Sequence, residues 1–160
     1  MDKKPVNRAC PERAITALAV NLPERDLRSL RAIFERHGWR LLEAASSREA
    51  LAWFAEYAIP VVICERELPD GDWRTLLNAL DTLYCPPKLI VSSRLADDRL
   101  WAEVLNLGGY DVLPTPFEAN ELGRVLRVAC LAWHRDWEGF RTGAPVEILQ
   151  AAKARAAGGA

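Results

Sequence analysis

Residues 60–73 read PVVICERELPDGDW and contain the clearest strand signal in the chain. Residues 60–64 are apolar or β-branched and carry no charge, which is typical of a strand buried on both faces of a parallel sheet. The LPDGD segment at 68–72 has the composition of a turn, and the leucine spacing at 76–80 predicts a helix after it. A buried strand followed by a turn and a helix is the repeating unit of an α/β fold.

The same alternation extends in both directions from this segment. Further strands are predicted at residues 14–20, 39–43, 89–91 and 110–113. Helices are predicted from Pro23 to Gly38, after the capping box of Ser46 and Glu49, after the turn at 68–72, at 96–107 and at 118–137. Five strands interleaved with five helices require right-handed crossovers, so the sequence predicts a parallel sheet covered by helices on both faces.

The charge balance narrows the class of partner. The 160 residues include 21 Lys and Arg against 22 Asp and Glu, for a net charge of −1, and 50% are apolar. This length fits one domain, with enough apolar residues for a core that needs no disulfide or metal. Nucleic acid is not expected as the main partner, because neutralising phosphates requires an excess of basic residues.

The sequence contains no signal for a membrane or a metal. No run approaches the ~20 apolar residues of a membrane span, and the N-terminal residues lack the apolar stretch of a signal peptide. The four cysteines, Cys10, Cys64, Cys85 and Cys130, are scattered without a C-x-x-C spacing, so no zinc site is expected. Buried free thiols suit a reducing compartment, and we expect a cytoplasmic protein.

The candidate functional residues follow from the parallel sheet. Functional groups of such sheets gather beyond the carboxyl ends of the strands. In this chain those positions are Asn21 and Leu22, Glu65, Ser92 and Ser93, and residues 114–116. No glycine-rich phosphate loop, nucleophile elbow or strand-end histidine accompanies them, which argues against a flavodoxin-like enzyme or small-molecule binder.

Four segments together resemble the receiver domain of bacterial response regulators of the chemotaxis-regulator type. They are SSREALAWF at 46–54, VVICERELPDGDW at 61–73, LIVSSRLADD at 89–98 and GGYDVLPTPFEANEL at 108–122. They occur in the family's order and spacing within residues 15–133. The resemblance implies a flavodoxin-like (βα)5 three-layer sandwich with a central five-stranded parallel sheet.

The resemblance also implies where a phosphorylation site would lie. In the family, an acidic pair after the first strand holds Mg²⁺, and an Asp after the third strand accepts the phosphoryl group. A hydroxyl after the fourth strand and a Lys-Pro pair after the fifth complete the site, and an aromatic residue three positions before the Lys switches conformation. The matching positions in this chain are, in that order, Asn21 and Leu22, Glu65, Ser92, Thr115 and Pro116, and Val112.

These replacements predict that the phosphorylation chemistry is lost. Mg²⁺ needs carboxylate, phosphate and water oxygens, but Leu22 offers no side-chain oxygen and Asn21 only a neutral one. Glu65 is then nearly the only charged ligand, and without metal or lysine no group neutralises the transferring phosphoryl group. We therefore expect no bound metal, no cofactor and no catalytic residue. A receiver that still accepts phosphate weakly remains the alternative.

Two side chains near this site leave alternatives open. Glu65 either imitates the phosphorylated state by reaching Ser92, or is a solvated carboxylate at a strand end. Trp73 stands where the family usually has glycine, and it covers the old pocket, projects as a contact residue, or is a partly buried residue at a helix start. Asp70 and Asp72 are expected to accept backbone N–H groups as turn and N-cap residues rather than to bind a ligand.

Receivers commonly use the surface of the fourth helix, fifth strand and fifth helix for partners. The candidate interface residues on this surface and on the extended last helix are Trp101, Tyr110, Leu122, Val125, Trp133 and Trp137. Aromatic side chains are the usual anchors of interfaces. A homodimer through this surface, or through the apolar stripe of the last helix, is one expectation, and an unidentified signalling protein is the other.

The sequence predicts a flexible segment at 1–13, a receiver-like domain at 14–138 and a tail at 139–160, within which 144–156 has the composition of a short helix before a disordered end. The function predicted is that of a stand-alone pseudo-receiver. Such a protein is not an enzyme. It is a phosphorylation-independent protein–protein interaction module in bacterial signal transduction.

Overall fold

The computed structural model describes residues 14–141. The main strands are β1 (Thr16–Val20), β2 (Arg40–Ala44), β3 (Val61–Glu65), β6 (Lys88–Ser93) and β7 (Asp111–Pro114). A short hairpin adds β4 (Glu67–Leu68) and β5 (Gly71–Asp72). The helices are α1 (Glu24–His37), α2 (Ser47–Glu56), α3 (Trp73–Leu80), α4 (Asp98–Asn106) and α5 (Ala119–Arg141).

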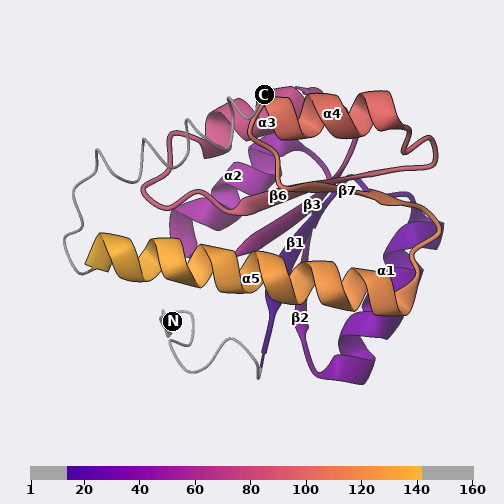
Figure 1. Ribbon diagram of the computed structural model, residues 1–160, viewed down its shortest axis with the longest axis horizontal. Helices are drawn as coiled ribbons and strands as arrows, with labels where there is room; N and C mark the ends of the chain where they lie inside the picture. The colour runs from indigo at the N-terminus through magenta and orange to yellow at the C-terminus, as the bar shows by residue number, and fades with distance from the viewer. Residues whose placement is uncertain (1–13, 142–160) are drawn as a thin grey trace.

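The sheet has five parallel strands in the order β2-β1-β3-β6-β7. Helices α2, α3 and α4 lie over one face, and α1 and α5 over the other (Figure 1). The predicted flavodoxin-like three-layer sandwich is therefore confirmed. Because all five strands run the same way, their carboxyl ends meet along one edge of the sheet.

Two apolar cores lie on opposite faces of the sheet, as the alternation of side chains along a strand requires. In β3, Val62 and Cys64 point into the core under α2, α3 and α4, whereas Val61 and Ile63 point into the core under α1 and α5. All four side chains are fully buried. This double burial explains why the strand that opens residues 60–73 carries no charge.

The helix boundaries follow the predicted capping signals. Helix α1 begins after Pro23 and ends at Gly38, whose φ of 67° is the left-handed conformation that glycine adopts at low cost. At the start of α2, the Glu49 N–H donates to the Ser46 hydroxyl at 3.2 Å, and the Glu49 carboxylate accepts from the N–H of Ala45 at 2.8 Å. The hydroxyl half of the predicted capping box is therefore present, whereas the carboxylate bonds to the residue before the N-cap instead of to the N-cap itself.

The β4–β5 hairpin was not predicted from the sequence, and its turn residue Asp70 also bonds to helix α2. The Asp70 carboxylate accepts hydrogen bonds from the Ser47 N–H at 3.0 Å, the Ser47 hydroxyl at 2.7 Å and the Arg48 N–H at 3.0 Å. These bonds lower the pKa of Asp70 below its ordinary value, the Ser47 hydroxyl most of all. Asp70 thereby ties the hairpin to the first turn of α2, while Asp72 caps α3 as predicted.

The apolar stripe of α5 belongs to the core of the domain. Leu126, Ala129, Cys130 and Trp133 are all buried, with Trp133 only 2% exposed. The prediction that this stripe needs a second copy of the protein or the tail as a cover is wrong for these positions, because the sheet and its neighbours already cover them. Helix α5 continues to Arg141, past the predicted domain end at residue 138. The predictions for residues 1–13 and 144–156 lie outside the described residues.

Candidate functional site

Two hollows lie along the carboxyl edge of the sheet. The β1–β2 hollow, of about 330 Å³, is lined by Asn21 and Leu22 together with Ala19, Leu27, Glu43, Ala44, Ala45 and Glu49. The β3–β6 hollow, of about 340 Å³, is lined by Glu65 together with Pro23, Asp26, Arg66, Glu67, Ser93, Arg94 and Leu95. The residues matching the family's acidic pair and its phosphoacceptor therefore line different depressions.

Asn21 is bonded to the hairpin that follows Glu65. Its φ of 54° is in the left-handed region, which Asn tolerates better than most residues. Its side-chain amide donates from Nδ2 to the carbonyl of Glu67 at 3.1 Å, and so holds the start of the β4–β5 hairpin. Asn21 has a structural partner where the family has a metal ligand.

Glu65 ends β3 with a half-buried carboxylate that bonds to its own backbone. Its Oε1 accepts from the N–H of Arg66 at 3.0 Å. Burial raises the pKa of Glu65 above its ordinary value, and the nearby Asp26 and Glu67 raise it further, while the Arg66 N–H and the Arg94 guanidinium oppose the rise. The net effect of these neighbours is to disfavour negative charge in the β3–β6 hollow.

Asp26 is the residue of this site that the sequence analysis missed. It lies in the first turn of α1, is only 3% exposed and lines the β3–β6 hollow beside Glu65. Its Oδ2 is buried and accepts no hydrogen bond from any residue that the structure describes. The sequence suggested that Glu65 is nearly the only charged ligand of the site, but Asp26 adds a second carboxylate to the same hollow. An acid in a first helical turn is ordinarily explained by the helix dipole, so only its burial distinguishes it.

Ser92 lies opposite Glu65 in the pairing of β3 with β6, but the two side chains do not bond. The fully buried Ser92 hydroxyl donates to the carbonyl of Cys64 at 3.3 Å, while the Glu65 carboxylate accepts from the backbone. The contact on which the phosphate-imitation hypothesis depends is absent from the described residues. Thr115 is buried with a cis peptide bond to Pro116, and neither residue lines the two hollows.

Val112 points into the core under α4, where it is 6% exposed. The position of the family's switch aromatic therefore holds a small, immobilised aliphatic side chain. A β-branched side chain packed on all sides has one preferred rotamer and no polar group to move toward a ligand.

The residues present do not fit the Mg²⁺ ion that the receiver resemblance implies. Leu22 has no oxygen, the Asn21 amide is bonded to Glu67, and Glu65 is bonded to Arg66. Within residues 14–141, no group of three or more His, Cys, Asp or Glu side chains is placed to hold a metal ion. Thr115 brings no positive charge to this edge. The positive charges that line the hollow with Glu65 are Arg66 and Arg94, and neither stands at the position of the family's lysine.

Trp73 does not cover the pocket, and that interpretation is wrong. It is fully buried in the core with Leu76 and Leu80, and it lines neither hollow. The Arg74 guanidinium lies over its ring, 5.2 Å from the ring centroid. The Trp73 Nε1 finds no acceptor among the described residues. At a position where the family has glycine, the Trp73 ring fills part of the domain interior.

The predicted interface residues divide into a buried and an accessible set. Leu122, Val125 and Trp133 are 1%, 3% and 2% exposed, so the prediction that they anchor a partner is wrong. They face the sheet because they share the apolar side of α5. Trp101 is 50% exposed, and its Nε1 donates to Asp111 at 3.1 Å.

Two further aromatic residues of that set are half-buried. Tyr110 packs against the core under α1 and α5, and Trp137 stacks on Trp133 with ring centroids 5.3 Å apart. Val128 and Leu131 of α5, which the sequence analysis did not select, are 49% and 39% exposed. Among residues 14–141, no helix has the length and apolar character required to cross a bilayer.

Comparison with known proteins agrees with the fold. Residues 24–127 match the family described as the response regulator receiver domain. The KDP operon transcriptional regulatory protein KdpE of Escherichia coli K12 is 33% identical over 103 residues, which cover 64% of this chain and 45% of KdpE. The chain thus spans less than half the length of that curated relative.

Two solved structures illustrate the similarity of the fold. The signal receiver domain of an HD domain-containing protein from Pseudomonas fluorescens Pf-5 has a TM-score of 0.70 at 28% identity, covering 79% of this chain and 93% of that one. The beryllofluoride-activated NtrC4 receiver domain dimer has a TM-score of 0.67 at 24% identity, covering 74% of this chain and 98% of that one.

Proposed function

The chain belongs to the response regulator receiver family, and from this premise we propose that it is a pseudo-receiver, which binds a signalling partner without being phosphorylated. Receiver domains are signalling modules that act through contacts with other proteins. In this proposal the chain keeps the role of a protein-binding module, but phosphorylation does not regulate the binding.

The observation that carries the proposal is the separation of the old site into two hollows. Asn21 and Leu22 line one hollow, and Glu65 lines the other. Phosphoryl transfer requires metal, acceptor and positive charge to converge on one group, since the enzyme stabilises charge at a single centre. Here the positions of the family's acidic pair, acceptor and lysine do not line one hollow, which supports a non-catalytic role.

The fixed conformation of the switch residues supports the same role. Ser92 is held by the Cys64 carbonyl and Val112 is packed in the core. A ligand shifts a conformational equilibrium only when two states bind it differently. With neither residue free to change partner, a phosphoryl group at Glu65 would have no switch to move.

One observation favours a second candidate, a receiver that still accepts phosphate weakly. Asp26 places another carboxylate in the β3–β6 hollow beside Glu65, and Mg²⁺ is bound in many proteins by one or two carboxylates with water. This candidate requires the ion to overcome the absence of a lysine at Thr115.

Amide NMR spectra of the isotope-labelled full chain separate the two candidates. The spectrum is recorded alone, with MgCl₂, and with MgCl₂ and beryllofluoride, a phosphoryl analogue. The pseudo-receiver proposal expects no saturable shift of the amides of Glu65, Ser92 or Thr115. Saturable shifts at these residues that disappear in Glu65→Gln would refute it and favour weak phosphorylation.

We also propose that the α4–β7–α5 face contacts the partner, with Trp101 as its accessible aromatic side chain. The NtrC4 receiver is a dimer, and a second copy of this chain is one partner that the same face could take. Sedimentation velocity over a range of concentrations tests this. The proposal for a second copy expects a dimer that Trp101→Ala weakens and beryllofluoride leaves unchanged, with Trp53→Ala on α2 as the matched tryptophan control. Equal effects of the two substitutions would contradict the use of this face.

A further inference from the structure

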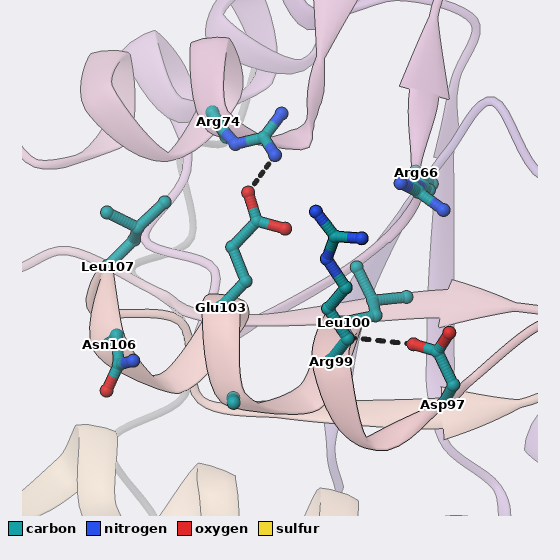
Figure 2. Close-up of a pocket in the computed structure, with 9 residues that line it drawn as sticks. Arg66, Arg74, Asp97, Arg99, Leu100, Glu103, Asn106 and Leu107 are labelled. Carbon is teal, nitrogen blue, oxygen red and sulfur yellow. Dashed lines mark hydrogen bonds and ion pairs between the residues drawn. The ribbon is translucent and has the colours of Figure 1, made fainter.

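A larger hollow lies between α3 and α4, on the side of the sheet opposite α1 and α5 (Figure 2). This α3–α4 hollow has a volume of about 790 Å³, and it is lined by three arginines, Arg66, Arg74 and Arg99, with Asp97 and Glu103 as the acidic residues. Arg66 also borders the β3–β6 hollow, while Arg74 and Arg99 do not. Nothing in the receiver site requires arginines at these three positions.

Both carboxylates of the α3–α4 hollow are already engaged. Asp97 is the N-cap of α4, and its side chain accepts from the N–H of Leu100 at 2.8 Å. Glu103 is paired with the guanidinium of Arg74, which also contacts Asp72 at 2.9 Å. These two carboxylates are thus committed to a helix end and to one arginine.

The other two arginines have no internal partner. The side chains of Arg66 and Arg99 are exposed, and neither forms a hydrogen bond or ion pair with any residue in the part of the chain that the structure describes. In Figure 2 the Arg99 guanidinium points from α4 into the space below α3, between Arg74 and Arg66. The lining therefore carries three positive and two negative charges, and the guanidinium groups of Arg66 and Arg99 border the concave surface without an ion pair among the described residues.

A guanidinium is a planar fork of N–H donors that matches a carboxylate with two parallel hydrogen bonds. The remaining lining adds Asn106, whose amide both donates and accepts, and Leu107, which is 48% exposed. An extended peptide presents all three groups that this set would bind, namely acidic side chains, backbone amides and an apolar side chain. The nine residues that line the hollow include no aromatic ring on which a nucleotide base would stack.

We propose that the α3–α4 hollow binds an acidic, extended segment of a partner protein, with carboxylates of the segment on Arg66 and Arg99 and an apolar side chain on Leu107. This inference rests on the proposed function, because it names the chemistry that a protein-binding pseudo-receiver recognises. It places the recognition between α3 and α4, so helix α4 is shared with the α4–β7–α5 face.

Fluorescence anisotropy with the full chain tests the proposal. The probe is a fluorescein-labelled polyglutamate peptide that ends in leucine, and its control is the same peptide with every Glu replaced by Gln. The Glu peptide should bind saturably and more weakly as salt is added, whereas the Gln peptide should not bind. Arg66→Gln and Arg99→Gln should each reduce affinity roughly tenfold, the loss expected when one charge-assisted hydrogen-bonded pair is removed. Arg124→Gln on α5, which removes an exposed arginine elsewhere, should have no effect.

Amide NMR shifts then locate the peptide, and the proposal expects them at residues 97–107 and around Arg74. Equal affinity for the Glu and Gln peptides, an Arg124→Gln effect as large as the other two, or no saturation up to about 1 mM peptide would overturn the proposal. Arginine-dependent binding of inorganic pyrophosphate in place of the peptide would overturn it in favour of a small anion. Self-association that Arg99→Gln abolishes, without peptide binding, would overturn it in favour of a second copy of the chain.

The two proposals fail in different ways. Phosphodonor labelling of Glu65 would refute the pseudo-receiver but would not change the peptide titration. Absence of peptide binding would remove the α3–α4 site and leave the unphosphorylated state of Glu65 as it is.

Discussion

Replacing Asp26 with Leu should stabilise the protein. Asp26 is 3% exposed, and its Oδ2 has no hydrogen-bond partner among residues 14–141. It also lies close enough to Glu65 to disfavour the charge on that residue. Leu branches at the same side-chain carbon as Asp, so the substitution Asp26→Leu keeps the shape while removing the buried charge. If the site no longer binds a cation, nothing compensates the carboxylate.

The size of the effect follows from two opposing contributions. A buried polar group without a partner costs about 1–3 kcal/mol. An acid in the first turn of a helix returns about 0.3–1 kcal/mol through the helix dipole, and Asp26→Leu loses this contribution. The net gain in the free energy of unfolding therefore spans about 0–2.7 kcal/mol, with a midpoint of about 1.4 kcal/mol. Each kcal/mol raises the Tm by roughly 3 °C for a domain of this size.

Urea unfolding followed by far-UV circular dichroism measures this gain, with and without MgCl₂. Glu24→Leu is the matched control, because Glu24 is an exposed acid in the same helical turn that pairs with Arg31 at 3.1 Å. The control should lose up to about 1 kcal/mol. The reasoning would be refuted if Asp26→Leu were no more stable than the wild type. It would also be refuted if MgCl₂ stabilised the wild type and not Asp26→Leu, since the carboxylate would then hold an ion.

Three further substitutions test other parts of the account. Asp70→Ala should lower the urea midpoint at pH 7, with Glu56→Ala, outside that contact, as the control. The loss should shrink as the pH falls below 3.8, because the folded-state pKa of Asp70 is lowered and Asp70 stabilises the fold only while it is ionised. Glu65→Gln should raise the urea midpoint at pH 7, because the raised pKa of Glu65 makes its charged form destabilising; the gain should vanish below pH 4.5, where the carboxyl is protonated in both states. Trp73→Ala should lose about 3–5 kcal/mol in chemical unfolding, as expected of a core aromatic, whereas a loss under 1 kcal/mol would return Trp73 to the surface role that its burial excludes.

The fold could be predicted because its strands are buried on both faces. Uninterrupted apolar runs such as residues 60–64 leave few alternatives, and Gly38 and Ser46 mark helix ends by chemistry that acts within a few residues. The β4–β5 hairpin could not be predicted, since strands of two residues have no periodicity to detect.

The identity of the missing site residues could be predicted, but their arrangement could not. Replacing acids at positions 21 and 22 is visible in the sequence, whereas the rotation of Asn21 toward the Glu67 carbonyl depends on a positive φ and a hairpin formed by later residues. Asp26 was missed for a related reason. Its contribution depends on burial against β3 and not on its neighbours in the chain.

The prediction of interface residues was wrong on helix α5, because this helix has apolar side chains both on its core side and at exposed positions. Leu122 and Val125 lie on the side of α5 that faces the sheet, while Val128 and Leu131 lie on exposed positions of the same helix. Both pairs are apolar, so composition alone does not separate the core side from the accessible side. The position of the helix on the sheet makes that distinction.

Intact mass spectrometry after incubation with acetyl phosphate and MgCl₂ tests the central claim most directly. The account predicts no added phosphoryl mass on the wild-type chain, because the positions of the family's acidic pair, acceptor and lysine do not line one hollow. Stoichiometric, acid-labile labelling of the wild type that Glu65→Gln removes would contradict it.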